Sequence, residues 1–371
     1  MNVPIKEYHM TLETIGPVYV GNGKEIDKKG YVFADKKHIN VIDLEKMYMY
    51  LAKKGLIDEY EKFLLGRGKL KLGQWLDKNN ISEDDIHNCV KYSMQCGDSM
   101  NINSADIKIC EHIKDPYNMP YIPGSSIKGM LRTILTAYDV MNNPQKYSNA
   151  KSSIGYNVLS NEKMGRKQLA LKEIKSIEAD CFNELKRDEK NKSNAVNDIM
   201  GGIIVSDSEA IDISNLILCK KLEGHVDGKE HELNVVRECI RPKTKIRFTI
   251  TIDETQCKSI TIDTIIEAVK AFANNYNKVF VSKFKDADWL EDDNVILGGG
   301  AGFVSKTIIY PLFGENDGLR ITRQILNRTT MPNREKKTTD ASAGVSPHII
   351  KYTKCNGHIL QMGLCRLTLD E

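Results

Sequence analysis

A nine-residue segment beginning at Gly124, Gly-Ser-Ser-Ile-Lys-Gly-Met-Leu-Arg, is the part of the chain best suited to hold an anion. Gly124 permits a tight turn, and Ser125 or Ser126 can cap a helix that begins there. A helix N-terminus carries unpaired N–H groups that favour phosphate. Lys128 and Arg132, four residues apart, can both reach a phosphate backbone. The alternative is an ordinary capped helix with solvated basic residues, and a P-loop is excluded because its glycine and lysine spacing is absent.

A glycine cluster in the last third of the chain can bring its backbone close to a ligand. It consists of Gly298, Gly299, Gly300, Ala301 and Gly302. Phe303 stands where the last glycine of a dinucleotide-binding motif would be needed, so we do not expect such a site. Lys306 follows within reach of whatever the loop approaches. The alternative is a mobile surface loop.

A basic stretch at 319–337 offers further contacts to phosphate. Its basic residues, which accompany the single acid Glu335, are Arg320, Arg323, Arg328, Arg334, Lys336 and Lys337. Arg320 and Arg323 share one helical face. Phe303 and Tyr310 lie between the glycine cluster and this stretch and can stack on bases. The alternatives are a solvated basic face and aromatic side chains that belong to the core.

Catalytic and metal-binding patterns are weak in this sequence. We recognise no Ser/His/Asp set and no nucleophile elbow. Asp207 and Glu209 can bind a cation or, more simply, cap a turn. The Cys and His residues near the C-terminus match no complete zinc site; they are Cys355, His358 and Cys365. We therefore expect no catalytic residue, no metal ion and no cofactor.

The composition is that of a globular protein, with 41% hydrophobic and 28% charged residues in 371. Lys and Arg total 53 and Asp and Glu total 50, so the net charge is only +3. Nucleic acid would therefore have to bind a local basic surface. The nine cysteines at irregular spacing indicate reduced thiols. No apolar run approaches the ~18 residues of a membrane span, and the opening residues lack a signal-peptide core, so we expect a cytoplasmic chain without membrane contact.

Hydrophobic periodicity predicts the elements that must position these residues. The first half contains a strand at 8–13 and a hairpin of strands at 31–34 and 38–43. A helix capped by Asp43 follows, and further helical chain extends to about residue 90. Its last helix follows Ser126, with a buried stripe at Ile127, Met130, Leu131, Ile134, Leu135 and Tyr138.

The second half follows a polar, charged stretch. We predict strands at 202–206, 216–219, 245–253 and 360–367, and a helix from Asp263 to about Phe284 capped by Thr261 or Asp263. This order indicates an α+β fold in two halves, each with an antiparallel sheet backed by helices. We divide the chain into an N-terminal half at 1–141, a polar helical insertion at 142–200 and a C-terminal half at 201–371.

Several motifs resemble those of one known superfamily. The stretch 120–132, Pro-Tyr-Ile-Pro-Gly-Ser-Ser-Ile-Lys-Gly-Met-Leu-Arg, is similar to the signature of the RAMP proteins of CRISPR effector complexes. The stretches 14–23 and 297–303 resemble their opening loop and glycine-rich loop. Three more stretches, 205–209, 237–244 and 357–365, favour the family of fifth subunits of the type III-A Csm effector complex. Tyr19 stands where the family often has histidine, which argues against imidazole-based cleavage there.

The resemblance implies a fold of two modified ferredoxin-like, RRM-like halves. It implies a non-catalytic RNA-binding subunit that caps the effector at the 3′ side of the guide RNA and supports guide maturation and antiviral defence. Expected partners are the guide RNA (crRNA), the neighbouring Csm backbone subunit, the small subunit and cellular trimming nucleases. On the matching positions, the implied RNA-binding residues are Gly124, Ser125, Ser126, Lys128, Arg132, Gly298, Gly299, Gly300, Gly302 and Lys306; the basic stretch adds Arg320 and Arg323.

Two rival functions remain open from the sequence. One is a metal-independent endoribonuclease that cuts the guide precursor, for which His9 or His38 would have to act as general base. The other is a protein-interaction module whose basic patches are incidental. For the RNA-binding reading, we expect removal of Lys128 and Arg132 to weaken RNA binding without abolishing folding, since both lie off the apolar stripe.

Overall fold

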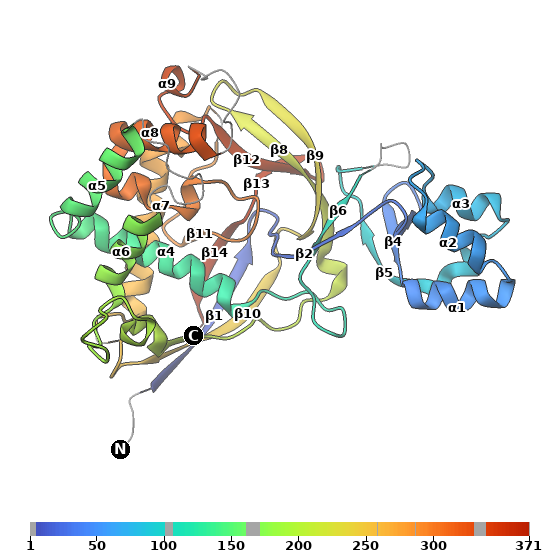
Figure 1. Cartoon of the computed structure of the whole chain (residues 1–371), viewed down its shortest axis with the longest axis horizontal. Helices are drawn as coiled ribbons and strands as arrows, with labels where there is room; N and C mark the ends of the chain where they lie inside the picture. The colour runs from blue at the N-terminus through green and yellow to red at the C-terminus, as the bar shows by residue number, and fades with distance from the viewer. Residues whose placement is uncertain are drawn as a thin grey trace.

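The computed structural model of the chain describes residues 5–100, 107–160, 171–257, 259–285, 287–329 and 339–370. It has the predicted α+β architecture, with two sheets, a layer of helices and a separate helical lobe (Figure 1). None of the helices in these ranges has both the length and the apolar character needed to cross a membrane.

The first sheet has five strands in the order β11-β14-β1-β10-β7. Their bounds are Ile5–Thr14 for β1, Ile203–Val205 for β7, Lys245–Asp253 for β10, Asn294–Ile296 for β11 and Leu364–Leu369 for β14. Strand β10 confirms the predicted alternation, because Ile246, Phe248, Ile250 and Ile252 are buried while Lys245 and Arg247 are exposed. Leu12 of β1 pairs with Ile246 in an antiparallel register, so the two strands bury the same face.

The second sheet has nine strands, arranged as β2-β6-β9-β8-β5-β4-β3 with β12 beside β8 and β13 beside β12. Their bounds are Gly21–Ile26, Tyr31–Phe33, His38–Ile42, Val90–Gln95 and Ile109–His112 for β2 to β6, then Leu216–His225, Glu230–Ile240, Ile349–Cys355 and His358–Gln361 for β8, β9, β12 and β13. The predicted hairpin is confirmed as β3 and β4.

One predicted strand is wrong, and a glycine explains why. The stretch 360–367 is the end of β13 and the start of β14, separated by a turn at Met362 and Gly363. Gly363 has φ of +80°, and a Cβ there would lie 2.2 Å from the carbonyl oxygen of Leu297. This conformation is open to glycine but strained for other residues, and it lets the chain pass from the second sheet to the first.

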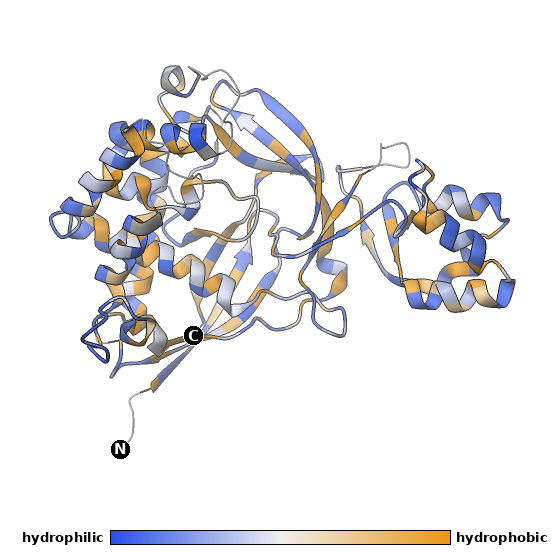
Figure 2. Ribbon diagram, viewed as in Figure 1, coloured by the Kyte–Doolittle hydropathy of each residue, from blue (hydrophilic) through white to orange (hydrophobic). Residues whose placement is uncertain are grey.

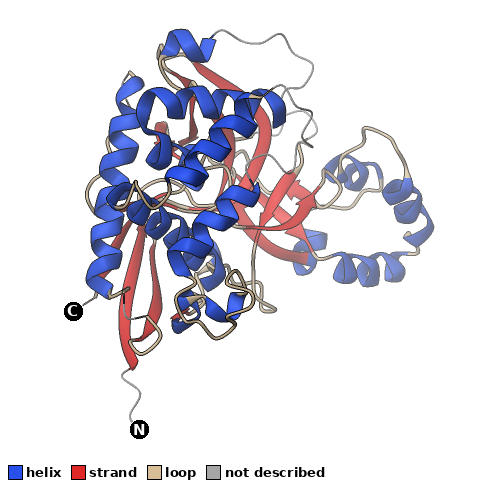
Figure 3. Cartoon of the chain, turned by 60° about the vertical axis from the view of Figure 1, so that its left-hand side comes forward, coloured by secondary structure: helices blue, strands red, loops and turns tan. Residues whose placement is uncertain are grey.

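Helices cover one side of the strands, as Figure 3 shows. Their bounds are Gly124–Asn142 for α4, Ser148–Leu159 for α5, Leu171–Phe182 for α6, Ile262–Val279 for α7, Ile309–Thr329 for α8 and Thr339–Ala343 for α9. The predicted stripe of α4 is confirmed, with Met130 and Tyr138 half-buried and its other members buried. Thr261 caps α7 by accepting from the N–H of Thr264, as predicted, but α7 ends at Val279 rather than near residue 284.

The helical lobe lies to one side of the sheets and has its own core (Figures 1 and 2). It contains α1 (Leu44–Lys54), α2 (Ile57–Leu65), α3 (Leu72–Lys78) and a 3₁₀ turn at Asp84–Cys89. Asp43 caps α1 as predicted, accepting from the N–H groups of Glu45 and Lys46. The helical chain predicted to about residue 90 is interrupted at residues 66–71, between α2 and α3.

The division of the chain at residues 141 and 200 stays a prediction. Both sheets contain strands from before residue 141 and strands from after residue 200. In the first sheet, β1 lies between β10 and β14, so the two ends of the chain share one core.

Candidate functional site

Helix α4 begins where its glycine packs against another strand. A Cβ at Gly124 would lie 2.2 Å from the carbonyl oxygen of Val205, so no larger residue fits there without a shift. The N–H of Gly124 donates to Oδ1 of Asp207 at 2.7 Å, and the N–H of Ser126 donates to the carbonyl of Pro123. The predicted capping role of Ser125 or Ser126 is therefore wrong. The cap comes from a residue 83 positions away, which no local pattern could indicate.

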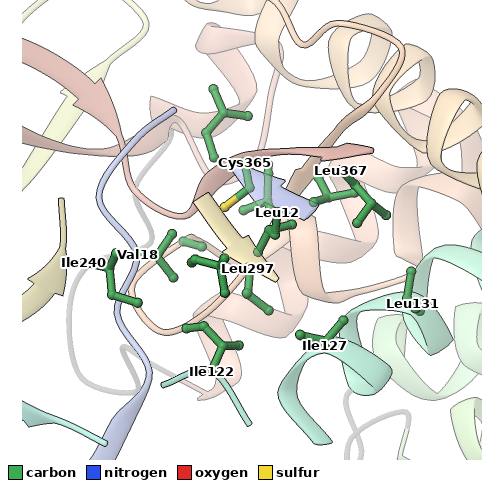
Figure 4. Close-up of a cluster of buried hydrophobic side chains, with 14 of the residues drawn as sticks. Leu12, Val18, Ile122, Ile127, Leu131, Ile240, Leu297, Cys365 and Leu367 are labelled. Atoms are coloured by element: carbon green, nitrogen blue, oxygen red, sulfur yellow. The ribbon is translucent and has the colours of Figure 1, made fainter. Parts of the chain in front are cut away.

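The glycine loop, residues 298–302, is held against the opening loop of the chain. The N–H of Gly299 donates to the carbonyl of Tyr19 at 2.6 Å. Gly298 has φ of +86°, and a Cβ there would lie 2.3 Å from the same carbonyl oxygen. Figure 4 shows Leu297, which precedes the loop, buried among Val18 and Ile127. The loop is thus anchored by core packing and a backbone hydrogen bond.

The two segments that the sequence singled out face each other across one cavity of about 320 Å³. Ser126 and Gly129 of α4 line it on one side, and Gly298 and Gly299 line it on the other, together with Lys306. Ser125 is exposed and is not among the lining residues. Much of this lining is backbone or small side chains, so a ligand can approach the main chain closely.

Lys306 is the cation of this cavity. It ends a 3₁₀ turn at Val304–Lys306, and its side chain is exposed. Among the residues that the structure describes, its ammonium group has no hydrogen-bond or ion-pair partner. Partial desolvation of the ammonium group lowers the pKa of Lys306 below its usual value. An unpaired cation beside exposed backbone is suited to an anionic ligand.

Lys128 and Arg132 are not brought to this cavity. The ammonium of Lys128 donates to the carbonyl of Ile203 at 2.6 Å, and desolvation lowers the pKa of Lys128. The guanidinium of Arg132 pairs with Asp198 at 2.7 Å and lies 4.5 Å from the ring centre of Phe182. Both cations hold neighbouring segments against α4. Their predicted contact with RNA stays a prediction.

The described part of the basic stretch at 319–337 does not line the cavity between α4 and the glycine loop. Arg320 is exposed on α8, beyond the kink at Gly314, and lines a different cavity with Lys151 and Phe313. Arg323 is half-buried on the same helix. The remaining basic residues, Arg334, Lys336 and Lys337, lie outside the described residues. The two aromatic residues predicted to stack on bases differ in burial. Phe303 is half-buried, whereas Tyr310 is buried and its hydroxyl donates to the carbonyl of Ser346.

A buried polar network next to the opening loop was missed by the sequence analysis. Glu238 is fully buried and accepts from the hydroxyl of Tyr92 at 2.6 Å, the N–H of His112 at 2.9 Å and the ammonium of Lys114. His112 is also fully buried. Its Nδ1 accepts from the N–H of Val20, so Nε2 is the atom that donates to the carbonyl of Tyr121. The network therefore connects four segments of the chain next to the cavity: the opening loop, β5, the stretch 112–121 and β9.

Because of His112, this network makes the free energy of unfolding depend on pH. Burial lowers the pKa of His112 to about 4, so the unfolded chain binds a proton more readily than the folded chain between about pH 6.5 and pH 4. We expect the free energy of unfolding to fall by about 3 kcal/mol across this window from His112 alone. Urea titrations at several pH values measure it. The His112→Phe variant should be less stable at neutral pH but show a flatter pH dependence, and equal slopes in the two proteins would contradict this assignment.

The histidines considered as general bases lie on different sheets. His9 is exposed on β1, with Nε2 3.8 Å from Glu7. His38 on β4 contacts Asp35 at 2.9 Å through Nδ1. Within the described ranges, no three His, Cys, Asp or Glu side chains gather into a group that could hold a metal ion.

Comparisons with known proteins agree on one family. A family model described as the RAMP superfamily matches residues 11–335. The protein "CRISPR system Cms protein Csm5" of Mycobacterium tuberculosis (strain CDC 1551 / Oshkosh) is 24% identical, with 100% of this chain and 99% of that protein covered. The Streptococcus thermophilus protein of the same name is 26% identical over 88% of this chain and 85% of its own length.

Two solved structures have the same fold. One is a chain of the "Csm-crRNA-target RNA ternary complex in type III-A CRISPR-Cas system", with a TM-score of 0.65 and 18% identity, covering 98% of this chain and all of that one. The other is the crystal structure of T. onnurineus Csm5, with a TM-score of 0.62 and 16% identity over 96% and 99% of the two chains.

Proposed function

Because the chain belongs to the RAMP superfamily, we propose that it is a non-catalytic, RNA-binding subunit of a type III-A CRISPR effector complex. In this role it caps the guide RNA at its 3′ side and supports guide maturation and antiviral defence. The names of its full-length relatives and the complex in which its fold recurs support the assignment.

The observation that carries the RNA-binding part is the cavity between α4 and the glycine loop. Among the residues that the structure describes, Lys306 has no hydrogen-bond or ion-pair partner, while Gly129, Gly298 and Gly299 leave the backbone uncovered by side chains. A phosphate of single-stranded RNA matches this combination of charge and access. We place the RNA contacts at this cavity rather than at Lys128 and Arg132, which donate to protein oxygens.

The partners that follow are the guide RNA (crRNA), the neighbouring Csm backbone subunit and the small subunit in the cytoplasm, with trimming nucleases acting on the guide. A tagged pull-down from cells that carry the neighbouring genes tests this assignment. We expect a discrete set of short RNAs with several partner proteins. Recovery of the chain alone, without RNA, would overturn it.

Removing the charge of Lys306 tests the cavity itself. We expect Lys306→Ala to weaken binding of the full chain to single-stranded RNA and to flatten the plot of log affinity against log salt by about 0.7, the contribution of one phosphate contact. Fluorescence anisotropy over a salt series measures both quantities. Lys78→Ala, an exposed lysine on α3 of the helical lobe, is the matched control.

Two results would contradict the proposed function. Equal affinities for the Lys306 and Lys78 variants would remove the cavity from the proposal. The same mixtures, without metal, should leave a guide precursor intact. If the precursor were cleaved, and if this cleavage were lost in His9→Ala or His38→Ala, the chain would be an endoribonuclease and the proposed non-catalytic function would be wrong.

A further inference from the structure

Arg237 is a second cation at the glycine loop for which the described residues provide no counter-ion. It lies on β9, between Cys219 of β8 and Cys110 of β6, and is half-buried. Within the described part of the chain, its guanidinium group has no hydrogen-bond or ion-pair partner. The centre of the Tyr19 ring lies 5.4 Å from the guanidinium carbon. A guanidinium held in place without a carboxylate retains its hydrogen-bond donors for another group.

Gly300 keeps the end of this side chain uncovered. The residue has φ of +81°, and a Cβ there would lie 3.2 Å from one terminal nitrogen of Arg237 and 3.6 Å from the other. A larger residue would therefore crowd the nearer terminal nitrogen and contact the other. With glycine at this position, the glycine loop passes the guanidinium group without covering it.

A neighbouring cation, Lys351, differs from Arg237 because it has an ion-pair partner. Lys351 lies beside Gly302, where a Cβ would be 3.6 Å from its Cγ. Its ammonium pairs with Glu223 at 2.5 Å. Burial lowers the pKa of Lys351, and the positive charge of Arg237 adds to this effect. Glu223 also pairs with Lys221 at 3.2 Å, whereas Arg237 has no ion-pair partner among the described residues.

We propose that Arg237 binds a phosphate of single-stranded RNA through its two terminal nitrogens, and that Tyr19 is the positioning residue that orients the guanidinium group. The inference rests on the proposed function and extends the RNA contact from Lys306, along the glycine loop, to Gly300. A planar guanidinium group binds phosphate in a bidentate manner that an ammonium group cannot reproduce. The aromatic ring fixes the plane of that group before RNA binds.

RNA affinities of matched variants of the full chain test this proposal. We expect Arg237→Ala to weaken binding of single-stranded RNA about tenfold or more, and Arg237→Lys to recover the salt dependence but little of the affinity. Arg247→Ala removes an equally charged, exposed side chain from the other sheet and should leave affinity unchanged. Tyr19→Phe should bind as the parent does, while Tyr19→Leu, which keeps the bulk but not the ring, should weaken binding.

A double-mutant cycle separates positioning from a general loss of structure. Tyr19→Leu should have little further effect in the Arg237→Ala background, because the residue acts through the guanidinium group. Additive losses would overturn the role of Tyr19. Affinity of Arg237→Ala equal to that of Arg247→Ala, with Lys306→Ala still weakened, would overturn this inference alone. If neither Lys306→Ala nor Arg237→Ala weakened binding, the proposed function at this site would fail.

Discussion

Replacing Glu238 with alanine will lower the free energy of unfolding by about 3–5 kcal/mol, because it breaks a buried ion pair. The side chain of Lys114 is only 8% exposed and would keep its charge without a counter-ion. The hydroxyl of Tyr92 and the N–H of His112 would also lose their acceptor. Leaving buried donors unpaired adds to the cost. Urea denaturation of the purified chain measures the change.

An exposed ion pair provides the control for this experiment. Glu25 contacts Lys108 at 3.0 Å, but their side chains are 49% and 69% exposed. We expect Glu25→Ala to change the free energy of unfolding by no more than about 1 kcal/mol, since solvent screens such pairs. A Glu238 variant as stable as the Glu25 variant would mean that the network does not support the fold.

The sequence predicted those elements whose signals are local. The alternation of Ile246, Phe248, Ile250 and Ile252 in β10 reflects one buried face, and it needs no knowledge of the partner strand. The cap at Asp43 depends on N–H groups two and three residues away. The turn at Gly363 was missed because the need for a residue without a Cβ comes from the approach of the Leu297 carbonyl, 66 positions earlier.

The sequence predicted the segments of the candidate site, but it did not predict which of their side chains the fold brings together. Helical period placed Lys128 and Arg132 beside the apolar stripe of α4, but it could not show that Asp198 and Ile203 cover that side of the helix. The role of Arg237 depends on a ring more than 200 positions away in the chain. Charges that appear free in a sequence are often paired in the fold, so the unpaired ones can be identified only after folding.

The glycine loop gives a prediction that affects both stability and RNA binding. Gly298→Ala places a side chain at φ of +86°, and its Cβ meets the carbonyl oxygen of Tyr19 at 2.3 Å. We expect a loss of about 2–4 kcal/mol in the free energy of unfolding, of which ~1–2 comes from the backbone conformation. The loop must also move from Tyr19, so RNA affinity should fall by at least about tenfold.

A second glycine separates the clash from the conformational cost. Gly228, in the turn of the β8–β9 hairpin, has φ of +83°, and a Cβ there would meet nothing within 4 Å. Gly228→Ala therefore carries the same backbone strain without the collision, and we expect it to cost about 1–2 kcal/mol with unchanged RNA affinity. Equal losses of stability in the two variants would show that strain alone accounts for the effect. Full RNA binding by the Gly298 variant would show that RNA does not depend on the position of this loop.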